Sequence, residues 1–176
     1  MKKFVITGGS GFIGSNLINF LLKKNFLIIN IDKGSYVNNA YNINLSQNDK
    51  YFFFKTDINN KSKVFNILKR FKPDGIFNLA AETHVDRSID NPSEFIKSNI
   101  LGVYNLLENI RDYKKKFKKN LRLLHVSTDE VYGDIDGKKR SNENYSYNPS
   151  SPYSATKASS DHLIKSYVRT YGVKAV

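Results

Sequence analysis

The sequence predicts an α/β fold, a doubly wound parallel sheet with helices on both of its faces. Short apolar runs with the character of strands alternate along the chain with longer segments whose apolar residues recur at helical spacing. Strands separated by helices pair in parallel, and right-handed crossovers then place helices against the sheet. The chain has 176 residues, which is enough for one domain of this kind and not for two.

Six segments have the apolar character of buried strands. They are residues 3–7, 26–32, 51–55, 75–80, 121–127 and 173–176. Between them, apolar residues recur at helical spacing in four segments, which lie within residues 13–21, 64–71, 96–110 and 153–171. Pro73 ends the second of these helices and Gly172 the last. The polar stretches 33–50 and 133–152 are predicted to be loops near strand ends, where doubly wound folds bind ligands.

The composition excludes several classes of function. Hydrophobic residues make up 40% of the chain, which suits a folded domain, and no apolar run approaches the length of a membrane span. There is no cysteine, so disulfides and thiolate metal sites are excluded, which suits a reducing, cytoplasmic location. The three histidines, at positions 84, 125 and 162, have no metal-ligand spacing, and we expect no metal.

The net charge of +12 does not by itself predict a nucleic-acid or membrane surface. The excess of lysine is spread over the whole chain. Its densest run, residues 114–119, lies between a predicted helix and a predicted strand. We therefore interpret this run as a solvated connection and expect neither a nucleic-acid nor a membrane partner.

A glycine-rich turn joins the first strand to the first helix. Gly8, Gly11 and Gly14 are spaced three apart between the two elements. Glycines in this context allow a sharp turn, a close approach of the backbone to a pyrophosphate, and close packing of helix on strand. The amino end of the helix then offers free N–H groups to the phosphates. The turn predicts a dinucleotide site.

Asp32, at the end of the second strand, indicates which dinucleotide is bound. A carboxylate at this distance from the glycines accepts hydrogen bonds from the adenosine ribose hydroxyls and repels a 2′-phosphate. We therefore expect the cofactor to be NAD and not NADP. Lys33 follows directly, and its positive charge weakens this discrimination.

Tyr153 and Lys157 open the last helix at positions i and i+4, on the same helical face. A free tyrosine has a pKa of about 10, and a neighbouring ammonium stabilises the phenolate and lowers that pKa. Such a tyrosine can take a proton from a hydroxyl whose carbon is being oxidised. With the glycine turn, the pair resembles the extended short-chain dehydrogenases/reductases, which act on nucleotide sugars.

Three residues at the end of the fifth strand separate activities within that family. The chain reads Thr128, Asp129 and Glu130, whereas epimerases and decarboxylases of the family usually have a small residue in place of the acids. Removing water needs a base for one proton and an acid for the leaving hydroxyl, and two neighbouring carboxyls tend to have separated pKa values. Adjacent strand residues point to opposite faces, so these side chains converge only if the chain turns after Thr128.

Three further segments, residues 78–88, 95–102 and 153–172, resemble the dTDP-glucose 4,6-dehydratases, and the likeness covers nearly the whole chain. The resemblance implies that Tyr153 is the base for the sugar 4-hydroxyl, that Lys157 modulates it, and that Thr128 binds the sugar. It implies a proton donor at Asp129 and an acceptor at Glu130. The cofactor positions that it implies are Gly8, Gly11, Phe12, Ile13, Gly14, Asp32, Lys33, Gly34, Ser35, Asp57, Ile58, Leu79, Ala80, Ala81, Glu82, Thr83, Ser98, Tyr153 and Lys157, with Thr83 also near the substrate.

The resemblance implies an NAD-dependent enzyme that converts dTDP-glucose to the 4-keto-6-deoxy sugar nucleotide in deoxysugar biosynthesis, as a homodimer. Relatives of this family are longer, so we expect residues 1–176 to form a Rossmann-type NAD-binding domain without the C-terminal part that binds the nucleotide sugar. Three alternatives stay open: the same chemistry on UDP-glucose, an epimerase or decarboxylase of the same family, and a non-catalytic NAD-binding remnant. The sequence also leaves open whether the chain is a fragment or a natural truncation.

Overall fold

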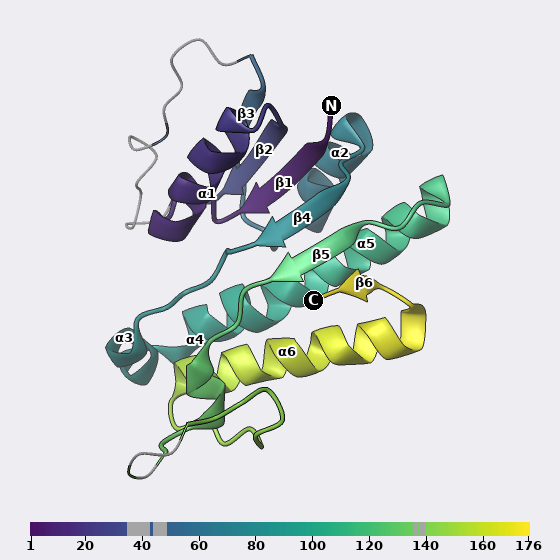
Figure 1. Cartoon of the computed structure of the whole chain (residues 1–176). Coiled ribbons are helices and arrows are strands. Elements are labelled where there is room, and N and C mark those ends of the chain that lie inside the picture. The colour runs from purple at the N-terminus through teal and green to yellow at the C-terminus, as the bar shows by residue number, and fades with distance from the viewer. Residues whose placement is uncertain (35–42, 44–48, 136, 138–139) are drawn as a thin grey trace.

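The computed structural model describes residues 1–34, 43, 49–135, 137 and 140–176 of the chain. Within these residues, six parallel strands form one sheet in the order β3-β2-β1-β4-β5-β6 (Figure 1). The strands are β1 (Lys3–Thr7), β2 (Leu27–Asp32), β3 (Tyr51–Lys55), β4 (Gly75–Asn78), β5 (Arg122–His125) and β6 (Lys174–Ala175). The order reverses its direction between β1 and β4, which is the topology of a doubly wound sheet. The predicted fold class is confirmed.

Four long helices occupy the segments that helical spacing predicted. They are α1 (Phe12–Lys23), α2 (Lys61–Phe71), α5 (Gly102–Phe117) and α6 (Pro152–Tyr171). Local sequence sets their ends: Asn60 caps the amino end of α2, and Ser151 forms a reciprocal capping box with Ser154 at the start of α6. Gly172, in the left-handed conformation with φ of 62°, ends α6.

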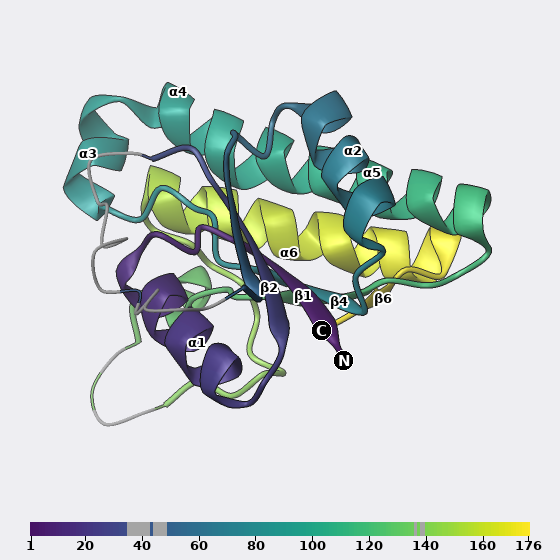
Figure 2. The same cartoon turned by 90° about the horizontal axis from the view of Figure 1, so that it is seen from above.

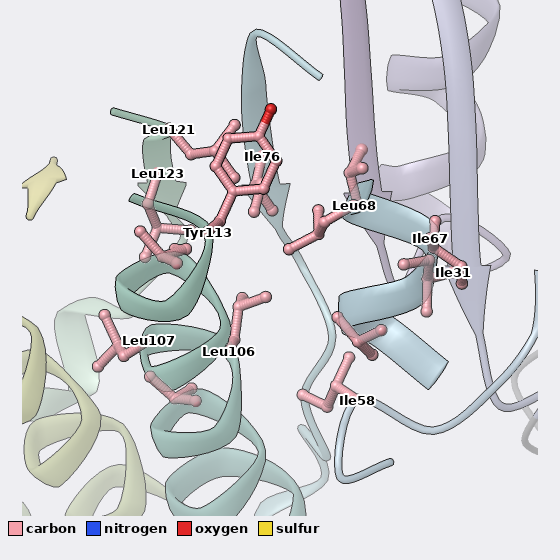
Figure 3. Close-up of a cluster of buried hydrophobic side chains, with 14 of the residues drawn as sticks. Ile31, Ile58, Ile67, Leu68, Ile76, Leu106, Leu107, Tyr113, Leu121 and Leu123 are labelled. Atoms are coloured by element: carbon pink, nitrogen blue, oxygen red, sulfur yellow. The ribbon is translucent and has the colours of Figure 1, made fainter. Parts of the chain in front are cut away.

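Helices cover both faces of the sheet (Figure 2). On one face α1 packs over β1 and β2, in a cluster that includes Ile6, Ile18 and Ile28. On the other face α2, α5 and α6 share a larger cluster, in which Leu106 and Leu107 of α5 are fully buried (Figure 3). Successive strand residues alternate between the two clusters, as the period of two along a strand requires.

Four strands are shorter than the sequence predicted: β2 and β5 lose one residue at their amino ends, β6 loses one at each end, and β4 and β5 lose two at their carboxyl ends. β4 ends at Asn78 and not at residue 80, and β5 ends at His125 and not at residue 127. The ends are level because Thr7, Asn78 and His125 lie side by side in the register of β1, β4 and β5. The Thr7 hydroxyl donates to Asn78 Oδ1 at 2.5 Å, and Asn78 Nδ2 lies 2.8 Å from His125 Nδ1. Beyond this polar row the chain leaves the sheet.

Short helical elements follow these two strand ends. After β4 come α3 (Val85–Asp90), α4 (Pro92–Phe95) and a π-helix, η2 (Ile96–Leu101), which runs directly into α5. After β5 comes a 3₁₀ helix, η3 (Asp129–Tyr132). The sequence did not predict α3, α4 or the π-helical geometry. None of the helices described is long and apolar enough to cross a membrane.

Candidate functional site

A cleft of about 390 Å³ opens at the carboxyl ends of the strands, where doubly wound sheets bind ligands. The glycine turn forms its floor, and the loop after β4 and the start of α6 form its walls. Its lining residues are Gly8, Gly11, Phe12, Ile13, Gly14, Ile31, Asp32, Lys33, Thr56, Asp57, Ile58, Leu79, Ala80, Ala81, Glu82, Thr83, His84, Ser98, Val126, Ser127, Tyr153 and Lys157.

The glycine turn leaves no room for side chains at two of its three predicted positions. Gly8 has φ of 70°, and a Cβ there would lie 2.6 Å from the backbone nitrogen of Ala80. A Cβ on Gly14 would lie 2.3 Å from the carbonyl oxygen of Gly8. Gly11 is the N-cap residue of α1, so no side chain at that position accepts a hydrogen bond from the first N–H groups of the helix, and no acidic residue occupies the first turn. The amino end of α1 therefore presents its N–H groups and positive potential to the cleft.

Asp32 is held at the edge of the cleft by two backbone N–H groups. Ser10 N–H donates to its Oδ2 at 2.9 Å, and Gly34 N–H donates to its Oδ1 at 2.7 Å. Both carboxylate oxygens keep a further lone pair. The carboxylate is thereby fixed in direction and can still accept hydrogen bonds from a bound group.

The loop after β4 forms the opposite wall and is anchored by a buried asparagine. Asn99, in the π-helix, accepts a hydrogen bond from Glu82 N–H at 2.9 Å and donates to the Glu82 carbonyl at 3.0 Å. Its amide also donates to the Thr156 hydroxyl of α6 at 2.9 Å. Neighbouring Ser98 lines the cleft. Asn99 joins the loop to α6, and the sequence analysis did not identify it.

Tyr153 and Lys157 face the cleft from the first two turns of α6. The Tyr153 backbone N–H donates to the Ser88 hydroxyl at 3.1 Å, which fixes the start of the helix against α3. The Lys157 ammonium donates to the Val126 carbonyl oxygen at 2.6 Å. Burial lowers the pKa of Lys157 to about 8, and the charge of Asp161 acts against this shift.

The pKa of Tyr153 differs from the sequence-based expectation. We expected Lys157 to lower it, but burial raises the pKa of Tyr153 above its usual value. A hydrogen bond with Thr128 lowers it, and the carboxylates of Glu130 and Asp129 raise it further. The ammonium of Lys157 is directed at a backbone carbonyl, while two acids stand near the phenol.

Asp129 and Glu130 lie on a helical turn directly after Thr128, as the convergence of their side chains requires. η3 begins at Asp129, and the Thr128 hydroxyl accepts a hydrogen bond from Glu130 N–H at 3.3 Å. The same hydroxyl lies 3.4 Å from Asp129 Oδ1. Thr128, Asp129 and Glu130 lie beside Tyr153 at the rim and are not among the residues that line the cleft.

The cleft brings together most of the predicted cofactor positions, from Gly8 in the turn to Lys157 in α6. Gly34 does not line it and contacts Asp32 instead. Ser35 lies outside the described residues. Five lining residues were not predicted: Ile31, Thr56, His84, Val126 and Ser127. No group of three His, Asp or Glu side chains suited to a metal occurs in the part of the chain that the structure describes.

These features fit a dinucleotide. The glycine turn admits a close approach to the backbone, the uncapped helix faces the cleft, and a directed carboxylate stands at the end of β2. With the strand order, they define a Rossmann-type dinucleotide-binding protein. The chain belongs to the GDP-mannose 4,6 dehydratase family, whose model matches residues 5–176.

The chain is also similar to individual proteins of known name. The chain is 41% identical over 183 residues to a dTDP-glucose 4,6-dehydratase of Neisseria meningitidis, covering 100% of this chain and 52% of that protein. A solved dTDP-glucose 4,6-dehydratase of Bacillus anthracis in complex with NAD superposes with a TM-score of 0.87 at 34% identity, covering 99% of this chain and 53% of that one. A UDP-glucose 4-epimerase of Thermus thermophilus in complex with NAD gives 0.86 at 30% identity, covering 98% and 53%. The chain spans about half the length of the curated relatives it matches.

Proposed function

We propose that the protein represented by this chain is an NAD-dependent nucleotide-sugar 4,6-dehydratase that acts on dTDP-glucose. One observation carries the proposal: Tyr153 and Lys157 line the same cleft as the glycine turn, and the carboxylates of Asp129 and Glu130 lie near enough to the Tyr153 phenol to raise its pKa. NAD, when bound in the cleft, supplies the acceptor and later the donor of hydride. The names of the similar proteins support the same reading.

The chain's own residues can then carry the proton transfers. Tyr153 takes the proton of the sugar 4-hydroxyl, and the Thr128 hydrogen bond stabilises its phenolate. The family resemblance implies that Lys157 modulates this base. The resulting 4-keto group acidifies the neighbouring carbon, C5. Glu130 accepts the proton from C5, and Asp129 protonates the hydroxyl that leaves C6. The loss of water leaves a double bond between C5 and C6, and a hydride returned to C6 with a proton returned to C5 would give the 4-keto-6-deoxy sugar nucleotide.

The acid pair favours dehydration over epimerisation. The epimerase of Thermus thermophilus has the same fold, so the fold does not separate the two activities. An epimerase needs no residue to protonate a leaving hydroxyl, whereas Asp129 and Glu130 provide both an acid and a base beside Tyr153.

The remaining parts of the proposal rest on the family resemblance. We propose that residues 1–176 form the NAD-binding domain and that the nucleotide-sugar contacts come mainly from outside them, since the relatives are about twice as long. We also propose a cytoplasmic homodimer. The choice of dTDP-glucose over UDP-glucose follows the relatives named above.

The test is a substrate panel with the purified protein and NAD. dTDP-glucose, UDP-glucose and GDP-mannose are incubated separately, and products are identified by mass spectrometry. Loss of one water from dTDP-glucose at the highest kcat/KM is expected. In Asp129→Asn, NADH should accumulate on mixing with substrate while the loss of water stops. In Tyr153→Phe, no NADH and no dehydrated product should form. Epimerised product, or wild-type turnover by Asp129→Asn, would refute the dehydratase assignment. Absence of turnover with NAD binding retained would favour a non-catalytic NAD-binding remnant.

A further inference from the structure

Asp161 of α6 lies one helical turn after Lys157 and has no role in the steps above. Tyr153, Lys157 and Asp161 follow one another at intervals of four, so they share one face of the helix. The Asp161 side chain is only 11% exposed. A carboxylate removed from water in this way is destabilising unless hydrogen-bond donors surround it.

Two hydroxyl donors and a neutral imidazole, from two other segments, surround this carboxylate. The Ser127 hydroxyl donates to Asp161 Oδ2 at 2.5 Å, and the Tyr147 hydroxyl donates to the same oxygen at 3.0 Å. His125 Nε2 lies 3.8 Å from Oδ1. Burial and then the charge of Lys157 lower the pKa of His125 to about 3, so the imidazole is neutral. None of these three neutral groups cancels the negative charge of the carboxylate.

The negative charge of Asp161 acts on the pKa of Lys157. Burial lowers the pKa of that ammonium, and Asp161 raises it. The groups that face Lys157 from other elements are the neutral His125 and the Val126 carbonyl of the strand-five segment. Tyr153 stands on its own helix, and the acids of η3 act on Tyr153. Asp161 is therefore the acid whose charge partly offsets the lowering of the Lys157 pKa by burial.

The same two α6 residues hold the chain just before the acid pair. Lys157 binds the carbonyl of Val126, and Asp161 binds the hydroxyl of Ser127. Thr128 and the turn of η3 follow at once. Tyr147 ties the segment before α6 to the same carboxylate, and Asn148 N–H donates to the Val131 carbonyl of η3 at 3.0 Å.

We propose that Asp161 is a positioning residue of the site: its carboxylate fixes the chain leading into Thr128 together with the segment around Tyr147, and its charge acts on the Lys157 ammonium one helical turn away. The inference rests on the proposed function for the meaning of Lys157. Its test measures Lys157 directly, without substrate or dinucleotide, so the inference and the function can fail separately.

The variant Asp161→Asn keeps the shape and one acceptor oxygen and removes the charge. Lysine Cε is labelled with ¹³C, Lys157 is assigned from the signal lost in Lys157→Arg, and its titration is followed by NMR. The pKa of Lys157 should fall from about 8 by about one, a tenfold lower ratio of charged to neutral amine at a given pH. Asp112→Asn is the control, because it removes the same charge from an exposed pair with Lys61. An unchanged midpoint in folded Asp161→Asn would overturn the proposal.

A second measurement tests the positioning role of Asp161 even if Asp161→Asn does not fold. The double variant Ser127→Ala and Tyr147→Phe keeps the charge and removes both hydroxyl donors. Amide exchange is measured at Gly133, whose N–H donates to the Glu130 carbonyl, and at Asn148. Exchange about tenfold faster at both, corresponding to about 1.4 kcal/mol of lost protection, is expected. Unchanged exchange at both amides would show that the carboxylate positions neither segment and would overturn the proposal.

Discussion

The Lys33 ammonium lies 2.6 Å from the Glu82 carboxylate and joins the end of β2 to the loop after β4, across 49 positions of sequence. Burial lowers the pKa of Lys33, but the hydrogen bond and charge of Glu82 outweigh it, and the net shift is upward. From the sequence we expected the charge of Lys33 to weaken the discrimination by Asp32 against a 2′-phosphate. In the structure the charge of Lys33 is paired with an acid.

Glu82→Gln should therefore shift dinucleotide preference toward NADP. The substitution frees a positive charge next to Asp32, and a free cation near the adenosine ribose favours a 2′-phosphate. We expect the ratio of Kd for NADP to Kd for NAD to fall about three- to tenfold, by titration at constant ionic strength. Asp112→Asn, which removes an exposed acid paired with Lys61, should leave the ratio unchanged. An equal change in both variants would mean that only net charge matters.

Gly14→Ala should destabilise the fold more than Gly11→Ala. A Cβ on Gly14 meets the Gly8 carbonyl at 2.3 Å and Gly9 Cα at 2.6 Å, whereas a Cβ on Gly11 meets only the Gly8 carbonyl, at 3.3 Å. Overpacking of backbone against backbone costs about 1–3 kcal/mol. Urea unfolding should place Gly14→Ala at least about 1 kcal/mol below Gly11→Ala. Equal free energies of unfolding would show that the turn relaxes without loss.

His125 should make the protein less stable in mild acid. Its pKa is about 3 in the folded chain, because of burial and then the charge of Lys157, against 6.5 ordinarily. As the pH falls below about 6.5, the unfolded chain binds a proton that the folded chain rejects, so this group lowers the free energy of unfolding by up to about 1.4 kcal/mol per pH unit. His125→Asn should lose less stability than the unsubstituted chain between pH 6.5 and 4.5 in urea titrations. Exposed His162 supplies the control variant, His162→Asn, and an identical slope for His125→Asn would contradict the prediction.

Asn109→Leu should stabilise the fold. Asn109 of α5 is fully buried, and neither its Nδ2 nor its Oδ1 has a hydrogen-bond partner among the described residues. Replacing an unsatisfied buried amide with an apolar side chain of similar size should raise the free energy of unfolding by about 1–2 kcal/mol. Asn105→Leu is the matched comparison on the same helix, because Asn105 Nδ2 donates to Asn59 Oδ1 at 3.2 Å. A loss of stability in Asn109→Leu, measured by thermal unfolding, would mean that the amide is satisfied in solution.

Features with a local signal were predicted from the sequence. Strands β1 and β3 were predicted to the residue, because their apolar runs are bounded by polar residues. The glycine turn and the Tyr153–Lys157 pair depend on spacings of three and four, which chain geometry converts directly into a turn and a shared helical face. Their meeting in one cleft follows from the strand order.

Features that depend on distant contacts were not predicted. Nothing near Lys33 indicates that Glu82 neutralises it, and nothing near Asn99 indicates that it anchors the loop after β4. The pKa of Tyr153 was predicted in the wrong direction, because burial and the acids of η3 act on the phenol in three dimensions. Gly9 was also missed: a Cβ there would lie 2.2 Å from Asn30 Oδ1 of β2, a contact that no spacing reveals.

The π-helix between α4 and α5 has a consequence for insertions and deletions. The π-helical turn contains one residue more than an α-helical turn, and it lies within a continuous helical run from Pro92 to Phe117. Before it, Phe95 packs against the Tyr153 ring; after it, Leu106 and Leu107 pack in the core. Removing one residue from Ile96–Leu101 would rotate one half of the run by about 100° relative to the other. The number of residues between the two halves is therefore fixed by the need for Phe95 to contact Tyr153 while Leu106 and Leu107 stay in the core.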